Sequence, residues 1–81
     1  MPLIKIEFTE KGAPAATVTV PVWMARSAAN MLPKAGRERF EARTDFDELA
    51  TLAARSPAGA VLLEVEDLEA GEKIVISVVG K

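Results

Sequence analysis

The fold is decided at residues 17–21, Thr17-Val18-Thr19-Val20-Pro21, where one kind of secondary structure gives way to another. The four residues before the proline are β-branched, and such side chains favour a strand. Pro21 lacks the amide hydrogen that a strand ladder needs, but it suits the first position of a helix. We therefore expect a strand that ends at Pro21 and a helix that begins there.

A second strand is expected before that stretch. Residues 3–9 alternate between apolar and polar side chains, which is typical of a strand with one buried face. The intervening residues 10–14 are partly charged and contain glycine and proline, as a chain reversal requires. This part of the chain predicts a β-hairpin whose buried face carries Ile4, Ile6 and Phe8.

Helices are expected after Pro21. Apolar residues recur at helical spacing over residues 22–32, which predicts one amphipathic helix. Pro33 ends that helix or starts a second, short one over residues 34–43. Gly36 lowers the helical propensity of this second segment.

A third helix is expected to begin near residue 46. Two overlapping capping pairs precede its apolar series, Thr44 with Asp47 and Asp45 with Glu48, and the sequence leaves the choice between them open. The Ser-Pro-Ala-Gly stretch at residues 56–59 ends this helix.

The last third of the chain predicts another hairpin. Val61, Leu63 and Val65 alternate with Leu62, Glu64 and Glu66 in the first strand, residues 67–72 turn the chain around Gly71, and Ile74, Ile76 and Val78 form the core side of the returning strand. The order is therefore two strands, helices and two strands. We expect an α+β fold in which a four-stranded antiparallel sheet, made of two hairpins, packs two or three helices on one face. With 81 residues there is room for one core, so residues 1–81 are expected to form a single domain.

The last predicted strand is apolar on both faces, because Val75 and Val79 lie opposite the core-facing isoleucines. Leu3 and Leu62 are expected to add to the same outer surface. An exposed apolar surface on a small open sheet requires a cover, and a homodimer formed face to face or edge to edge would provide one. The expected interface comprises Leu3, Leu62, Val75 and Val79.

Several segments together resemble a recurring small bacterial domain of unknown function. They are Lys5-Ile6, residues 17–23 (TVTVPVW), residues 31–34 (MLPK), residues 44–49 (TDFDEL), residues 64–67 (EVED) and residues 71–74 (GEKI). Domains of that family often follow a short SHOCT-like helical segment. The chain departs from the family at Ala42-Arg43, where relatives tend to have a glycine. The resemblance implies the same order of strands and helices in a module that accompanies other parts, and it brings no catalytic residues.

The reactive residue types are few. The chain has no histidine and no cysteine, which excludes Ser-His and Cys-His catalysis as well as zinc sites built from those ligands. The carboxylates at positions 45–48 are explained as helix caps, and those at positions 67–72 lack the ligand spacing of a calcium loop. The single glycines match no nucleotide-binding motif. We expect a protein that is not an enzyme and binds no metal or cofactor.

Charge is unevenly distributed along the chain, although the net charge is only −2. Acidic residues crowd residues 64–72, so we expect a basic helical side and an acidic hairpin side. This basic patch consists of Arg26, Lys34, Arg37, Arg39 and Arg43. It is open to three interpretations: a solvated helix face, a complementary protein contact or a nucleic-acid surface. The last is the least favoured, because the nearby aromatics Trp23 and Phe40 suit the core and leave nothing to stack on bases.

These features favour a non-enzymatic protein-interaction or oligomerisation module. The expected partner is a second copy, forming a homodimer, or another protein. The alternative is a small nucleic-acid-associated regulator that uses residues 26–43. Lys5 and Glu7 interrupt the apolar residues in the first seven positions, and no window approaches a membrane span, so we expect a cytoplasmic protein without membrane contact.

Overall fold

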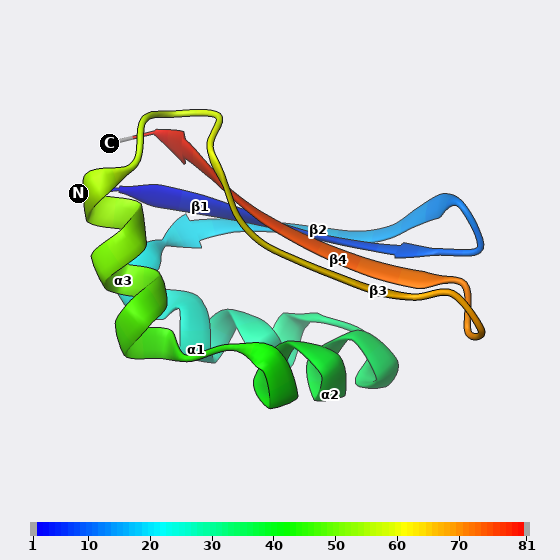
Figure 1. The fold of residues 1–81 in the computed structure, drawn as a ribbon. Helices are drawn as coiled ribbons and strands as arrows, with labels where there is room; N and C mark the ends of the chain where they lie inside the picture. Colours follow the sequence, from blue (N-terminus) through cyan, green and yellow to red (C-terminus); the bar gives the residue numbers. More distant parts are fainter. Residues whose placement is uncertain (1, 81) are drawn as a thin grey trace.

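The computed structural model describes residues 2–80 and shows an α+β fold (Figure 1). Four strands and a central helical section follow one another in the order expected. The elements are β1 (Leu3–Glu10), β2 (Ala13–Pro21), the 3₁₀ turn η1 (Val22–Met24), α1 (Ala25–Ala28), the 3₁₀ turn η2 (Ala29–Met31), α2 (Lys34–Arg43), α3 (Phe46–Arg55), β3 (Val61–Asp67) and β4 (Glu72–Gly80).

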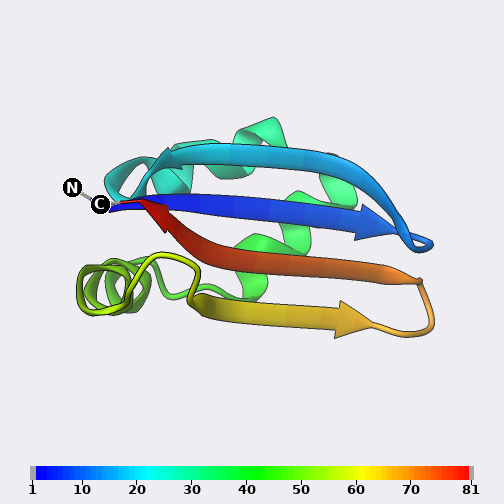
Figure 2. The same ribbon diagram turned by 90° about the horizontal axis from the view of Figure 1, so that it is seen from above.

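The four strands form one antiparallel sheet with the order β2-β1-β4-β3 (Figure 2). Each hairpin pairs its own strands, and the two hairpins meet where β1 pairs with β4. Ile6 lies opposite Val18 of β2 on one side and opposite Ile76 of β4 on the other. The first and last strands therefore occupy the centre of the sheet, and β2 and β3 are its two edges.

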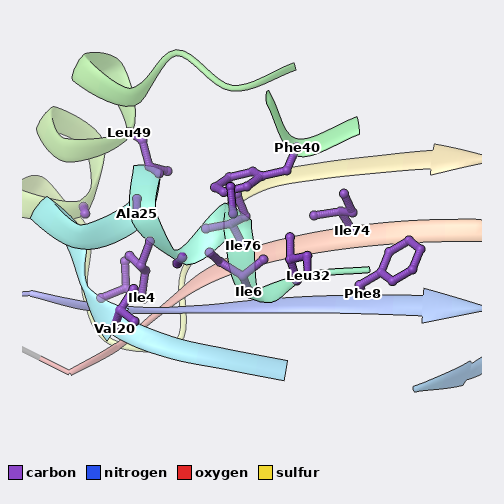
Figure 3. Packing of buried hydrophobic residues seen from close by; sticks show 14 residues of the cluster. Ile4, Ile6, Phe8, Val20, Ala25, Leu32, Phe40, Leu49, Ile74 and Ile76 are labelled. Atoms are coloured by element: carbon purple, nitrogen blue, oxygen red, sulfur yellow. The ribbon is translucent and has the colours of Figure 1, made fainter. Parts of the chain in front are cut away.

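All the helices cover the same face of the sheet, and the core lies between the two layers (Figures 1 and 3). The alternation in β1 and β4 determines this arrangement, because every second residue points toward the helices. The isoleucines at positions 4, 6, 74 and 76 have no exposed surface. The helical layer contributes small alanines together with Leu32, Phe40 and Leu49. The core is thus wholly apolar among the described residues.

The segment after Pro21 differs from the single helix expected over residues 22–32. It forms a 3₁₀ turn, one short α-helical turn and a second 3₁₀ turn. No side chain caps any of these turns, so a longer helix lacks a defined start. Its buried residues are mostly alanines, which let the chain lie close to the sheet without regular helical geometry. Trp23, expected in the core, is 66% exposed on the first of these turns.

The other two helices have the expected positions. Asp45 caps α3: its Oδ1 atom accepts hydrogen bonds from the backbone N–H groups of Asp47 (3.0 Å) and Glu48 (3.1 Å). Of the two possible caps, the structure therefore uses Asp45. In α2, the buried Gly36 lies against the ring of Phe8, and a Cβ atom there would come within 2.9 Å of the ring carbon Cγ. Glycine is required for this close approach of helix and sheet.

Both hairpin tips extend past the helical layer at one end of the molecule (Figure 1). Lys11 and Gly12 connect β1 to β2 with φ angles of 51° and 80°, values typical of a two-residue type I′ turn. The backbone N–H of Lys11 donates a 2.6 Å hydrogen bond to the carbonyl oxygen of Gly71 in the other tip. This bond joins the two hairpins at the end where no helix supports them.

Candidate interaction surface

The face of the sheet opposite the helices, here called the outer face, has no described element over it (Figure 1). The strand registers place its side chains in rows across the sheet. One row joins Thr19, Lys5, Ser77 and Val61, and the next joins Thr17, Glu7, Val75 and Glu64. The outer face is therefore mixed in character, with threonine, charged and apolar side chains side by side.

Three of the four residues expected at an interface lie on or beside the outer face. Val75 is half-buried between Glu7 and Glu64, its neighbours in the adjacent strands. Leu3 is 37% exposed and Val79 41% exposed, where β1 begins and β4 ends. The apolar part of the outer face is thus concentrated at the end of the sheet away from the hairpin tips.

Leu62 differs from the expectation, because it faces the helices. The pairing of β3 with β4 shifts between Val61 and Leu63, so Leu62 is the extra residue of a β-bulge. Its side chain is half-buried against the core cluster. Strict alternation would have placed it on the outer face, and the bulge reverses that direction.

Two ion pairs lie on the outer face. The Nζ atom of Lys5 is 3.4 Å from a carboxylate oxygen of Glu7, and that of Lys73 is 3.2 Å from one of Glu64. All four side chains are well exposed, so each pair contributes little to stability. Their positive and negative charges nevertheless alternate across the middle of the outer face. A surface that binds there needs charges of opposite sign at the matching positions.

Arg39 of α2 forms the most developed polar cluster of the described residues. Its Nε and Nη2 atoms lie 2.7 and 2.6 Å from Oε1 of Glu72, and Nη2 is also 2.7 Å from Oδ2 of Asp67. Both carboxylates belong to the strand ends of the β3–β4 hairpin. One guanidinium thus ties α2 to this hairpin.

The same contacts shift two pKa values. The Asp67 carboxylate accepts a 3.1 Å hydrogen bond from the backbone N–H of Ala70. That bond and the Arg39 guanidinium lower the pKa of Asp67. The hydrogen bond to Glu72 is the main reason that the pKa of Arg39 is raised above its ordinary value. The acidic turn is therefore explained by hairpin geometry and by its bond to α2.

The basic residues of the expected patch other than Arg39 belong to two elements, α1 and α2. Arg26 lies on α1 with its guanidinium carbon 4.4 Å from the centre of the Phe46 ring. Lys34 is exposed and Arg37 half-buried on α2, and the side chain of Arg43 lies outside the described part of the structure. The expected basic and acidic sides are in fact neighbours, because α2 lies beneath the acidic hairpin and Arg39 is already engaged with it.

Hollows along β3 are a feature that sequence reasoning missed. One, of about 110 Å³, lies between α3 and the start of β3, and its lining includes Leu49, Leu52, Leu62 and Leu63 together with Asp45 and Glu48. A second lies between α2 and β3, next to Val65. No local pattern signals them, because they arise where helices α2 and α3 diverge beneath the sheet edge.

Residues 2–80 contain no group of three or more acidic residues placed to hold a metal ion. Within the same residues, no helix has the length and apolar character needed to cross a membrane. Comparisons with family models, with curated proteins and with solved structures found no match to this chain. The resemblance to a small bacterial domain stays a prediction from the residues alone.

Proposed function

We propose that this chain is a non-enzymatic protein-interaction or oligomerisation module that makes contact through the outer face of its sheet. The observation that supports the proposal is the lack of any described element over that face, although Leu3, Val75 and Val79 lie on or beside it. Apolar side chains on a surface of this kind are stabilised when another surface removes them from water. The favoured occupant is a second copy, which makes the working form a homodimer.

The chemistry of the outer face suits a protein partner. Its apolar end offers area for burial, and its alternating charges would pair with opposite charges of a partner and repel an ill-matched one. The nucleic-acid alternative has less support, because Glu72 and Asp67 already neutralise Arg39, the central cation of the proposed basic patch. As part of the same proposal we assign the protein to the cytoplasm.

The test combines Val75→Lys with Val79→Lys. A lysine at position 75 would lie between two glutamates, so the variant is expected to fold. We expect it to sediment as a monomer at concentrations where the unaltered chain forms dimers, because two desolvated cations would be placed in the interface. The matched control is Ala35→Lys with Ala42→Lys, two exposed positions in the helical layer, which should leave the dimer intact.

Sedimentation velocity and a pull-down with tagged chain measure the outcome. If the oligomer size and the captured partners are the same for the outer-face variant and the unaltered chain, the outer face is not the contact surface. If the unaltered chain stays monomeric and captures no partner, the proposed function is wrong as a whole.

A further inference from the structure

We propose that the free edge of β3 binds an extended segment of another protein, in which apolar and basic residues alternate. Such a segment would add a fifth strand to the sheet by β-augmentation, a mode in which main-chain hydrogen bonds give affinity and alternate side chains give specificity. The proposal uses the edge of the sheet, so it stands or fails separately from the contact through the outer face.

The first argument is the availability of the edge. β3 is the outermost strand beside β4, and no described element pairs with its other side (Figure 2). Unpaired backbone groups along an edge strand are a template for another strand. The opposite edge, β2, is protected by Pro14 and Pro21, which cannot donate to a ladder, and by an irregular register near Phe8. β3 contains no proline.

The second argument is the row of hollows on the helix side of β3. Leu63 and Val65 both point to that side, since they pair with the core residues Ile76 and Ile74. The leucine-lined hollow lies beside Leu63, and the hollow formed with α2 lies beside Val65. Alternate residues of a strand point to the same side at a spacing of about 7 Å. Two apolar side chains of an added strand, at positions i and i+2, would therefore enter the two hollows.

The third argument is charge. Glu64 and Glu66 point to the outer face between those positions and are both exposed. Glu64 pairs only with the well-exposed Lys73, and within residues 2–80 Glu66 makes no ion pair. Asp45 and Glu48 also line the first hollow, and Glu38 lines the second together with Arg39, whose charge is already paired with Asp67 and Glu72. Cross-strand pairs of opposite charge stabilise strand pairing, so residues of the partner opposite Glu64 and Glu66 should be lysine or arginine.

The same charges argue against a second copy at this edge. Antiparallel pairing of two β3 strands would bring the carboxylates at positions 64, 66 and 67 of one copy close to those of the other. Like charges across a strand pair weaken it. The edge therefore favours a basic partner from another protein.

The probe is a labelled eight-residue peptide in which valine and lysine alternate, and fluorescence anisotropy measures its binding. Because the contact is small, we expect a dissociation constant on the order of 100 µM at low salt. Two control peptides have glutamate in place of lysine, or the same residues grouped in two blocks. Both should bind at least about five-fold more weakly, since one reverses the charge pairing and the other destroys the alternation.

Two double variants of the protein each remove two negative charges, one at the β3 edge and the other, as a control, away from it. Glu64→Gln with Glu66→Gln should weaken binding of the alternating peptide about five-fold, through the loss of two cross-strand charge pairs. Glu10→Gln with Glu41→Gln removes the same charge at exposed positions away from the β3 edge and should leave affinity unchanged. All four side chains are exposed, so both variants should fold as the unaltered chain does, which circular dichroism checks.

Backbone amide shifts provide the second readout. On addition of the alternating peptide, the largest NMR shift changes should fall in Val61–Asp67 and spare β2. No binding of the alternating peptide up to millimolar concentration overturns the proposal. The proposal is also overturned if the control peptide with its residues grouped in two blocks binds as tightly as the alternating peptide. Equal weakening by both pairs of protein variants, or NMR shift changes centred on another element, overturns it as well.

Discussion

Gly36 shows how one residue sets the distance between helix and sheet. Glycine costs a helix about 1 kcal/mol relative to alanine, which made α2 a doubtful helix from sequence. The structure gives the reason for its presence: the position is buried, and Phe8 of β1 occupies the space where a Cβ atom would lie. The loss in helical propensity is offset by the closer packing of the Phe8 ring beneath α2.

We expect Gly36→Ala to destabilise the fold by about 1 kcal/mol. Overpacking a well-filled core costs about 1–3 kcal/mol, and the gain in helical propensity returns part of this. Chemical denaturation measures the change in the free energy of unfolding.

Two further variants separate the effect of helical propensity from the effect of packing against Phe8. Ala42→Gly, at an exposed position of the same helix, isolates the propensity effect and should cost about 0.5–1 kcal/mol. In a Phe8→Leu background the alanine at position 36 has room, so there it should be neutral or stabilising. Stabilisation by Gly36→Ala with Phe8 in place would show that the ring can move aside and that the contact is not tight.

At the scale of elements, the bond between α2 and the β3–β4 hairpin makes stability depend on pH. The folded state lowers the pKa of Asp67, so this group stabilises the fold at pH values above its unfolded pKa of about 4. The contribution is lost as the pH falls through the lower folded pKa. Arg39 stays charged throughout this range, because an arginine guanidinium loses its proton only at far higher pH.

We therefore expect Arg39→Gln to be less stable than the unaltered chain at pH 7, and the difference to shrink as the pH falls toward 2. The variant removes the ion pairs with Asp67 and Glu72, and acid removes the first of them by protonating Asp67. Urea unfolding at several pH values gives the measurement. Arg55→Gln, at an exposed arginine of α3, is the control and should show no such convergence. A constant difference across the range would mean that Arg39 acts by packing alone.

Elements with strict local patterns could be predicted, and those shaped by their neighbours could not. Alternation placed β1 and β4 correctly, and the capping pairs on either side of Phe46 predicted the start of α3. The alanines over residues 22–32 fit a helical stripe, but they fit a succession of tight turns equally well. Nothing near Trp23 in the sequence showed that its ring would point to solvent.

At the scale of the whole molecule, the sequence predicted the direction of some outer-face residues and not of others. The two-sided pattern of the last strand correctly indicated that Val75 would lie opposite the core. Leu62 was misplaced because a bulge is decided by the pairing partner and leaves no mark on the strand's own sequence. The pairing of the basic helix with the acidic hairpin was also missed, since charge segregated along a chain need not stay segregated in space.

The central pairing of β1 with β4 has a consequence for biosynthesis. Ile4, Ile6 and Phe8 leave the ribosome well before residues 72–80, and until those residues follow one side of β1 has no neighbour. Long-range pairing of this kind delays folding, because loop closure must precede the contacts that reward it. We expect a nascent chain held by an arrest peptide to generate folding force only when β4 has left the exit tunnel. Until then the edge of β1 that later pairs with β4 has unpaired backbone groups, which are a template for pairing with another chain.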